Sequence, residues 1–284
     1  MSYLFLSPLQ YQFMLNAFLM VFIISLPASI ISCYLVLKGW ALLGDAISHA
    51  VLPGVVIAYL LGIPLVLGAF VAGMICSMLA GFFSENSRVK KDSILGVVFS
   101  GMFAIGLVLH LKISTDVHLD HILFGNILGI ALSDLFVSGF ISLLVFCIII
   151  LKRRDLMLHS FDPIQAQLVG LRSGLLHYGL LIMISLTVVS SLASVGIILS
   201  IGILIAPGAI AFLITRSFHR MLIVALLTSL FAGFLGVYLS FFIDSAPAPT
   251  VIVIFSLVFA IVFFGSQFSL LVRDKRVINR EGKG

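Results

Sequence analysis

An acidic side chain and an imidazole four residues apart are the groups in this sequence best suited to chemistry. Asp45 and His49 lie in the stretch 44–54 (GDAISHAVLPG), whose other residues are apolar or small. On a helix this spacing puts both side chains on one face. Pro53 has no N–H to donate to the carbonyl of His49, so a backbone oxygen should be freed beside the pair.

A carboxylate and a neutral imidazole form a mixed oxygen and nitrogen ligand set. Such a set suits manganese, iron or zinc better than magnesium or calcium, which prefer oxygen, or copper(I), which prefers sulfur. One chain offers too few ligands. We therefore expect two copies to meet on a two-fold axis, so that two Asp45 and two His49 side chains face one ion. The alternative is a hydrogen-bonded pair that only stabilises helix packing.

The composition of the whole chain predicts that this pair lies inside a membrane. Of 284 residues, 16 are Lys or Arg and 11 are Asp or Glu, while 62 % are hydrophobic, and the mean hydropathy is +1.29. Soluble domains carry about 25 % charged residues. These values exclude a sizeable soluble catalytic domain and predict an all-α, multi-pass membrane helix bundle. Ionisable residues within such spans usually serve transport.

Nine apolar runs are long enough to cross a bilayer, which needs about 20 residues per helix. They lie near 11–37, 41–61, 64–83, 93–111, 133–151, 175–195, 197–215, 221–243 and 250–271. The count becomes eight if the first run or 197–215 does not cross fully. The first run is long enough to be retained as a span rather than cleaved as a signal peptide. Residues 1–284 are thus expected to form a single transmembrane domain.

Basic residues fix the expected orientation, because positive charges concentrate on the cytoplasmic side of a membrane protein. With nine spans only Lys112 falls on the outer side. The other basic residues face the cytoplasm: Lys38, Arg88, Lys90, Lys91, Lys152, Arg153, Arg154, Arg172, Arg216, Arg220 and the five in the tail 272–284. The net charge of +5 therefore reports orientation rather than a nucleic-acid partner. The N-terminus is expected outside and the C-terminus in the cytoplasm.

Two polar connections between the runs have a pattern of their own. In the connection 152–174, Asp162 can cap a helix that begins at Pro163 and stops before Gly170. Ile164 and Leu168 would share the apolar face of that helix. Near the outer side, His110, Asp116, His118, Asp120 and His121 either collect a cation from outside or form an ordinary solvated loop.

The stretch 37–54 (LKGWALLGDAISHAVLPG) resembles the signature of the membrane permease subunits of bacterial ABC importers for manganese, zinc and iron. Further matches follow in order at 124–129 (FGNILG), 160–163 (SFDP) and 206–209 (APGA), so the similarity covers about residues 11–272. The Lys-Gly-Trp opening resembles the manganese and iron members more than the zinc members.

This resemblance implies a type II ABC importer permease fold and a role in moving divalent metal inward across the bacterial cytoplasmic (inner) membrane. It implies that Asp45 and His49 line the metal pathway of a permease homodimer, or of a heterodimer with a paralogous permease. It also implies that Asp162–Gly170 docks on a cytoplasmic ABC ATPase dimer, and that an extracytoplasmic metal-binding protein delivers the ion. No permanently bound cofactor is implied, only the transported manganese, iron or zinc.

Two other function classes compete with this interpretation. The sequence contains no G-x-x-x-x-G-K-[ST], so ATP must be hydrolysed by a partner subunit if ATP is the energy source. A proton-coupled secondary metal transporter would instead use Asp45 and His49 as a proton relay. An intramembrane metalloprotease needs a motif such as H-E-x-x-H, which the sequence lacks.

Overall fold

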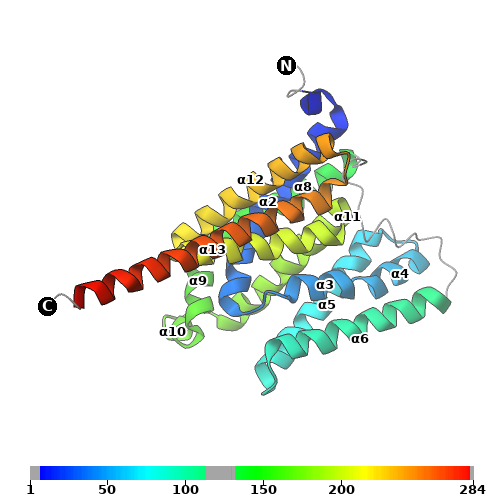
Figure 1. The fold of residues 1–284 in the computed structure, drawn as a ribbon. Helices are drawn as coiled ribbons and strands as arrows, with labels where there is room; N and C mark the ends of the chain where they lie inside the picture. The colour runs from blue at the N-terminus through cyan, green and yellow to red at the C-terminus, as the bar shows by residue number, and fades with distance from the viewer. Residues whose placement is uncertain (1–6, 113–128, 130–131, 282–284) are drawn as a thin grey trace.

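The chain folds into a bundle of long apolar helices (Figure 1). A computed structural model describes residues 7–112, 129 and 132–281. Its elements are η1 (Ser7–Gln10), α2 (Gln12–Lys38), α3 (Leu43–Ala50), α4 (Leu52–Leu61), α5 (Leu65–Asn86), α6 (Lys91–Lys112), α8 (Leu132–Leu151), α9 (Arg153–Phe161), α10 (Pro163–Leu168), α11 (Ser173–Ile214), α12 (Phe218–Ile243) and α13 (Pro247–Glu281). No strand occurs among the described residues. The expected all-α fold is confirmed.

Eight helical stretches of the described residues are long and apolar enough to cross a membrane, with α3 and α4 counted together. Most of their bounds lie within three residues of the predicted runs. The exception is α13, which continues to Glu281 instead of ending near 271. No Gly or Pro interrupts residues 266–281, so nothing in the local sequence stops the helix there. Residues 272–281 of the basic tail are therefore a helical extension of the last span.

The longest helix, α11, consists of two segments that meet at Gly196. Its φ of 81° and ψ of 174° lie in a region that is essentially reserved for glycine. The hydroxyls of Ser191 and Ser200 hydrogen-bond to each other across this point, although nine residues of straight helix would separate them by about 13 Å. The two segments therefore fold back on each other. With α11 counted as two, the eight stretches become nine, in agreement with the predicted runs 175–195 and 197–215.

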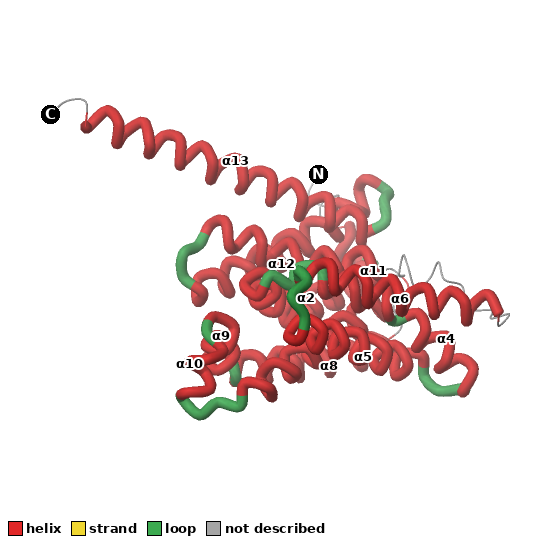
Figure 2. The backbone as a smooth tube through the Cα atoms, turned by 90° about the horizontal axis from the view of Figure 1, so that it is seen from below, coloured by secondary structure: helices red, strands yellow, loops and turns green. Residues whose placement is uncertain are grey.

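The helices form two groups that α11 joins. In the first group, α2 contacts α8, α11 and α12, and α13 packs on α11 and α12. In the second, α3, α4, α5 and α6 contact one another, and α3 and α5 also contact α11 (Figure 1). The short helix α10 and the C-terminal end of α13 lie at the same end of the bundle in both views (Figures 1 and 2). This is the end that the charge pattern assigns to the cytoplasm.

Within the second group, α4 and α5 touch backbone to backbone. A Cβ atom added to Gly54 would lie 2.1 Å from the carbonyl oxygen of Gly68, and one added to Gly68 would lie 2.2 Å from that of Gly54. Ala58 and Ala72 follow four residues later in each helix. Small residues at this spacing let membrane helices approach closely, because association in lipid depends on packing rather than on a hydrophobic driving force.

A buried serine holds the second segment of α11 against α2. The hydroxyl of Ser32 donates a hydrogen bond to the carbonyl of Ile205 (3.1 Å) and accepts one from the N–H of Gly208 (2.9 Å). A Cβ atom at Gly208 would lie 2.5 Å from the carbonyl oxygen of Ser32. The residues 206–209 are thus a close-packing motif between two central helices.

Candidate metal site

Asp45 and His49 lie together on α3, as their spacing predicted. The Nε2 atom of His49 is 3.3 Å from Oδ1 of Asp45, and about a third of each side chain is exposed, 31 % for His49 and 32 % for Asp45. A pair that only stabilised packing would also make this contact. It would not need to remain accessible. The exposed fraction leaves both side chains able to reach an ion.

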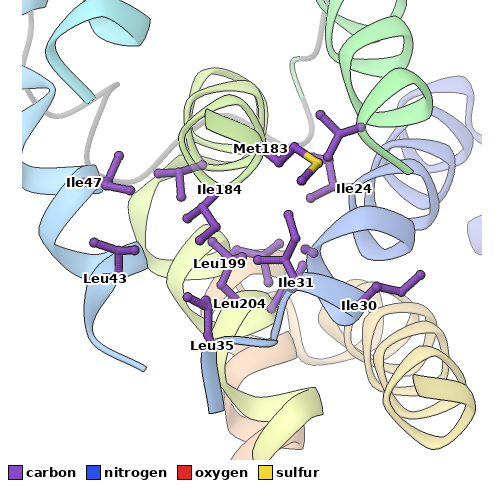
Figure 3. Close-up of a cluster of buried hydrophobic side chains, with 14 of the residues drawn as sticks. Ile24, Ile30, Ile31, Leu35, Leu43, Ile47, Met183, Ile184, Leu199 and Leu204 are labelled. Carbon is purple, nitrogen blue, oxygen red and sulfur yellow. The ribbon is translucent and has the colours of Figure 1, made fainter. Parts of the chain in front are cut away.

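The rest of α3 is packed inside the bundle. Its buried residues are Leu43, Gly44, Ala46, Ile47, Ser48 and Ala50. Leu43 and Ile47 belong to the same buried cluster as Leu199 and Leu204 of α11 (Figure 3). The hydroxyl of Ser48 donates to the carbonyl of Gly44 (2.8 Å). Asp45 and His49 are therefore on the accessible face of a helix whose other faces are fixed by packing.

The predicted proline break lies directly after this helix. The α3 helix ends at Ala50 and α4 begins at Leu52, with Val51 between them. Pro53 occupies the first turn of α4, where a missing N–H is tolerated. Pro53 has no hydrogen to donate to the carbonyl of His49, but that carbonyl accepts a backbone N–H at the end of α3. The expectation of a freed backbone oxygen beside the pair was therefore wrong. The span 43–61 is thus two short helices, of which only the first carries the ionisable pair.

Two aromatic side chains of α6 lie against the ring of His49. The ring centroid of His49 lies 6.0 Å from that of Phe99 and 5.6 Å from that of Phe103, the latter in an edge-on arrangement. One turn further along α6, a Cβ atom on Gly106 would lie 2.8 Å from the nitrogen of Pro53. Sequence analysis assigned no role to these residues. Their spacing places them on one face of α6. This shared face is the only feature of the sequence that could have indicated them.

The described part of one chain does not complete a metal site. No group of three or more His, Cys, Asp or Glu side chains able to hold an ion occurs in it. Of the candidate outer cluster, His110 lies in the last turn of α6. Asp116, His118, Asp120 and His121 lie outside the described residues. Within the described part of the chain, Asp45 and His49 are thus a pair without a third side chain able to bind the same ion.

The connection between α8 and α11 contains the short helix that was predicted. Oδ1 of Asp162 accepts hydrogen bonds from the N–H groups of Ile164 (3.0 Å) and Gln165 (2.9 Å), and Pro163 is the first residue of α10. The helix ends at Leu168, and the N–H of Leu171 then bonds back to the carbonyl of Ala166 (3.0 Å). The residues that cap and end the helix are thus those that the sequence indicated.

The apolar face of α10 is uncovered in the described chain. Ile164 is 71 % exposed and Leu168 is 82 % exposed. Ala166, on the opposite side, is buried. An exposed apolar face on a helix outside the spans is typical of a surface that binds a partner.

Long apolar helices around an accessible acid–imidazole pair define a multi-pass α-helical membrane protein of the transport class. The particular family follows from comparison with known proteins. The chain matches the ABC 3 transport family over residues 10–266 and belongs to that family. It is a membrane permease of the ABC transporter type.

Individual relatives agree with this assignment. The chain is 53 % identical over 255 residues to the chelated iron transport system membrane protein YfeD of Yersinia pestis, covering 90 % of this chain and 86 % of that protein. It is 41 % identical over 274 residues to the manganese transport system membrane protein MntB of Synechocystis sp., covering 95 % and 89 %. PsaBC from Streptococcus pneumoniae, solved in complex with a Fab, is similar in structure. Its matching chain has a TM-score of 0.81 at 31 % identity, covering 93 % of this chain and 95 % of that one. The expected ABC permease fold is confirmed.

Proposed function

We propose that this chain is the permease subunit of an ABC importer for a divalent transition metal, and that Asp45 and His49 bind the ion during its passage. The observation that carries the proposal is an accessible carboxylate–imidazole pair on a helix that is otherwise buried. Iron and manganese, the metals in the names of the relatives, both accept mixed oxygen and nitrogen ligands. Zinc would bind the same set, so the ligands alone do not select the metal.

A second copy of the chain completes the site in this proposal. Two Asp45 and two His49 side chains give four ligands, whereas the described residues of one chain contain no group of three or more such side chains. The two carboxylates carry a charge of −2, which balances a divalent cation in a medium where an unbalanced charge is costly. A closed two-fold dimer is also the commonest arrangement of identical subunits.

We infer that ATP hydrolysis by a separate cytoplasmic subunit drives the transport, because this sequence has no phosphate-binding loop of its own. The exposed face of α10 is the proposed docking surface for that ATPase. Leu168→Asp should abolish co-purification of the ATPase, since it places a charge in an apolar contact. Gln167→Asp, at the adjacent exposed position, adds the same charge beside that face and should leave co-purification intact. Equal retention of the ATPase by both variants would rule out this surface.

The orientation follows from the same proposal. The ends of α2, α6 and α9 that carry basic residues lie together. Nζ of Lys91 donates a hydrogen bond to the backbone carbonyl of Lys38 (3.2 Å). The hydroxyl of Tyr34 donates one to the backbone carbonyl of Arg153 (3.1 Å). We infer that this end, with α10 and the basic tail, faces the cytoplasm of a bacterial cell. An extracytoplasmic metal-binding protein would then deliver the ion at the opposite end.

Uptake of Mn²⁺ or Fe²⁺ by cells carrying single substitutions tests the metal site. Asp45→Asn and His49→Ala should reduce accumulation to background while the complex still assembles. In the dimer, His49→Ala removes two of four ligands and Asp45→Asn removes both negative charges, so the loss should exceed the roughly 10- to 100-fold cost of removing an outer-shell partner. Asp244→Asn and His219→Ala, at exposed positions away from α3, are the matched controls. Wild-type uptake by both site variants would refute the proposed role of the pair.

The same assay separates the ABC mechanism from a proton-coupled secondary transporter. Deleting the ATPase should stop uptake, and an uncoupler applied while ATP is maintained should not. The opposite pattern would mean that Asp45 and His49 relay protons and that the energy source proposed here is wrong.

A further inference from the structure

A second group of polar and aromatic side chains meets at the end of the bundle where α9 and α10 lie. Trp40 comes from the turn before α3, Glu85 from the end of α5, Lys91 from the start of α6, His159 from α9 and His177 from the start of α11. Trp40, His159 and His177 are only 6 %, 3 % and 4 % exposed. Five segments of the chain thus meet here, with three buried rings and with Glu85 and Lys91 exposed beside them.

The rings in this cluster are in direct contact. The ring of His177 lies edge-on to Trp40, with centroids 5.3 Å apart, and edge-on to His159, with centroids 6.2 Å apart. Nδ1 of His177 is 3.4 Å from Oε1 of Glu85. His177 therefore connects a residue of the α9–α10 segment on one side with a residue of the α3 turn on the other.

The ammonium groups of two lysines also lie over the ring of Trp40. The Nζ atoms of Lys38 and Lys91 lie 4.8 Å and 5.7 Å from the centroid of the Trp40 ring, within the range of cation–π attraction. Lys91 also donates to the backbone carbonyl of Lys38 (3.2 Å). The indole thus contacts residues of α2, α6 and α11.

His159 is held by a hydrogen bond at the end of the cluster that is nearer to the α10 docking surface. Its Nδ1 atom hydrogen-bonds to the hydroxyl of Ser173 (2.9 Å), the first residue of α11. It lies three residues before Asp162, the cap of α10. One turn of α9 therefore connects the imidazole of His159 to the start of α10.

The cluster has a feature that packing alone does not account for. The Nε2 atoms of both His159 and His177 are buried and have no hydrogen-bond partner, which costs stability that an apolar side chain would not. A metal ion is a poor explanation, because Lys38 and Lys91 bring two positive charges to the same place. No group of three metal-binding side chains occurs there either, within the described chain.

The α3 helix is connected directly to the turn that contains Trp40. It has only eight residues, and the break at Val51 separates it from α4. At its other end, α2 stops at Gly39, whose φ of 66° is a left-handed conformation that favours glycine. Trp40 lies in the turn between Gly39 and Leu43. The helix that carries Asp45 and His49 is therefore short, and is joined to α2 through the turn that contains Trp40 and to α4 through Val51.

We propose that His159, His177 and Trp40 are positioning residues that transmit movement of the docked α9–α10 segment to α3, and so set the accessibility of Asp45 and His49 to the ion. The inference rests on the proposed function, because it requires an ATPase on α10 and an ion at α3. The contacts run without interruption from His159 to His177 to Trp40, and Trp40 is joined to α3 by the chain itself. These residues do not touch the metal.

Transport coupled to hydrolysis tests this route. The permease is purified with its ATPase, reconstituted in vesicles, and supplied with Mn²⁺ as the probe ion. His177→Ala and Trp40→Ala should lower the Mn²⁺ transported per ATP hydrolysed by about fivefold or more, the lower end of coupling between separate sites. ATP hydrolysis itself should persist. Trp40→Phe, which keeps an aromatic ring, should restore most of the ratio, and His219→Ala should leave it unchanged.

A second measurement distinguishes transmission from a merely structural role. The chain has a single tryptophan, so fluorotryptophan incorporated into the permease alone gives one fluorine resonance, that of Trp40. A non-hydrolysable ATP analogue added to the complex should shift this resonance, and His159→Ala on α9 should abolish the shift. No shift in the wild-type complex, or a full shift in the His159 variant, would overturn the proposal. The proposal would also be overturned if His177→Ala and Trp40→Ala both transported as much Mn²⁺ per ATP hydrolysed as the wild type.

A failure of the contact route can be distinguished from a failure of the proposed function. If the wild-type complex does not take up Mn²⁺ in an ATP-dependent way, the proposed function is wrong. The fluorine measurement needs no metal, so it reports on the contact route in either case.

Discussion

Replacing Gly54 by alanine tests how tightly the helix after the candidate site is held. The new Cβ atom would lie 2.1 Å from the carbonyl oxygen of Gly68 and 2.6 Å from Cβ of Ala72. Ordinary contact begins at 3.4 Å, so the two atoms must separate by about 1.3 Å, the difference between 3.4 and 2.1. Both are attached to helix backbone, so no side chain can rotate away to relieve the clash. Helices α4 and α5 must move apart.

Overpacking of this kind typically costs about 1–3 kcal/mol. At about 2–4 °C per kcal/mol, the thermal midpoint of the purified protein should fall by roughly 2–12 °C. Gly54 directly follows Pro53, so the displacement should also move the end of α3 and reduce metal uptake. Gly68→Ala should have a similar effect. The double variant should lose less than the sum of the two, because the first substitution already opens the gap.

Thermal unfolding in detergent, followed for the variants in parallel, is the assay. Gly101→Ala is the matched control, because a Cβ atom there meets nothing within 4 Å. It should melt at or slightly above the wild-type midpoint, since alanine favours helix over glycine. If Gly54→Ala melts together with Gly101→Ala, the close contact between α4 and α5 is not present as described.

Three further outcomes follow from contacts elsewhere. Ser32→Ala leaves the buried N–H of Gly208 without its acceptor, so the free energy of unfolding should fall by about 1–2 kcal/mol in equilibrium denaturation. Burial and the nearby Lys38 ammonium lower the pKa of His159 from 6.5 to about 4. Stability should therefore be constant above pH 6.5 and fall as the pH drops towards 4, by up to about 1.4 kcal/mol per pH unit. Melting curves of the His159→Gln variant should show a smaller pH dependence. Asp162→Ala removes both cap hydrogen bonds of α10, which costs about 1 kcal/mol and should speed proteolysis of this helix while the spans stay intact.

The spans could be predicted because each is a continuous apolar run between charged or turn-forming residues. The same reasoning separated the two segments of α11, since Gly196 lies between the predicted runs. It also placed Asp45 beside His49 and Asp162 at the start of α10, because both depend on residues a few positions apart. The predicted run near 250–271 agrees with the last span, Pro247–Gln267, but the helix continues beyond it to Glu281, because polar residues alone do not stop a helix.

What could not be predicted depends on contacts between distant segments. The approach of Phe103 to His49, and the meeting of Trp40 with His177, join helices whose order in space the hydrophobic pattern does not encode. The contact of Gly54 with Gly68 is an intermediate case. The small residues at fixed spacing are visible in the sequence, but their partner is identified only in the fold.

The packing of α3 limits which residues of the proposed metal site can be altered. Saturation mutagenesis along this helix has few productive targets, because most of its side chains are locked against α5, α6 and α11. Leu42, just before the helix, is 47 % exposed and lies on the same stripe as Asp45 and His49. Selectivity engineering should therefore begin at these three positions, where a new donor atom can be introduced without disturbing the bundle.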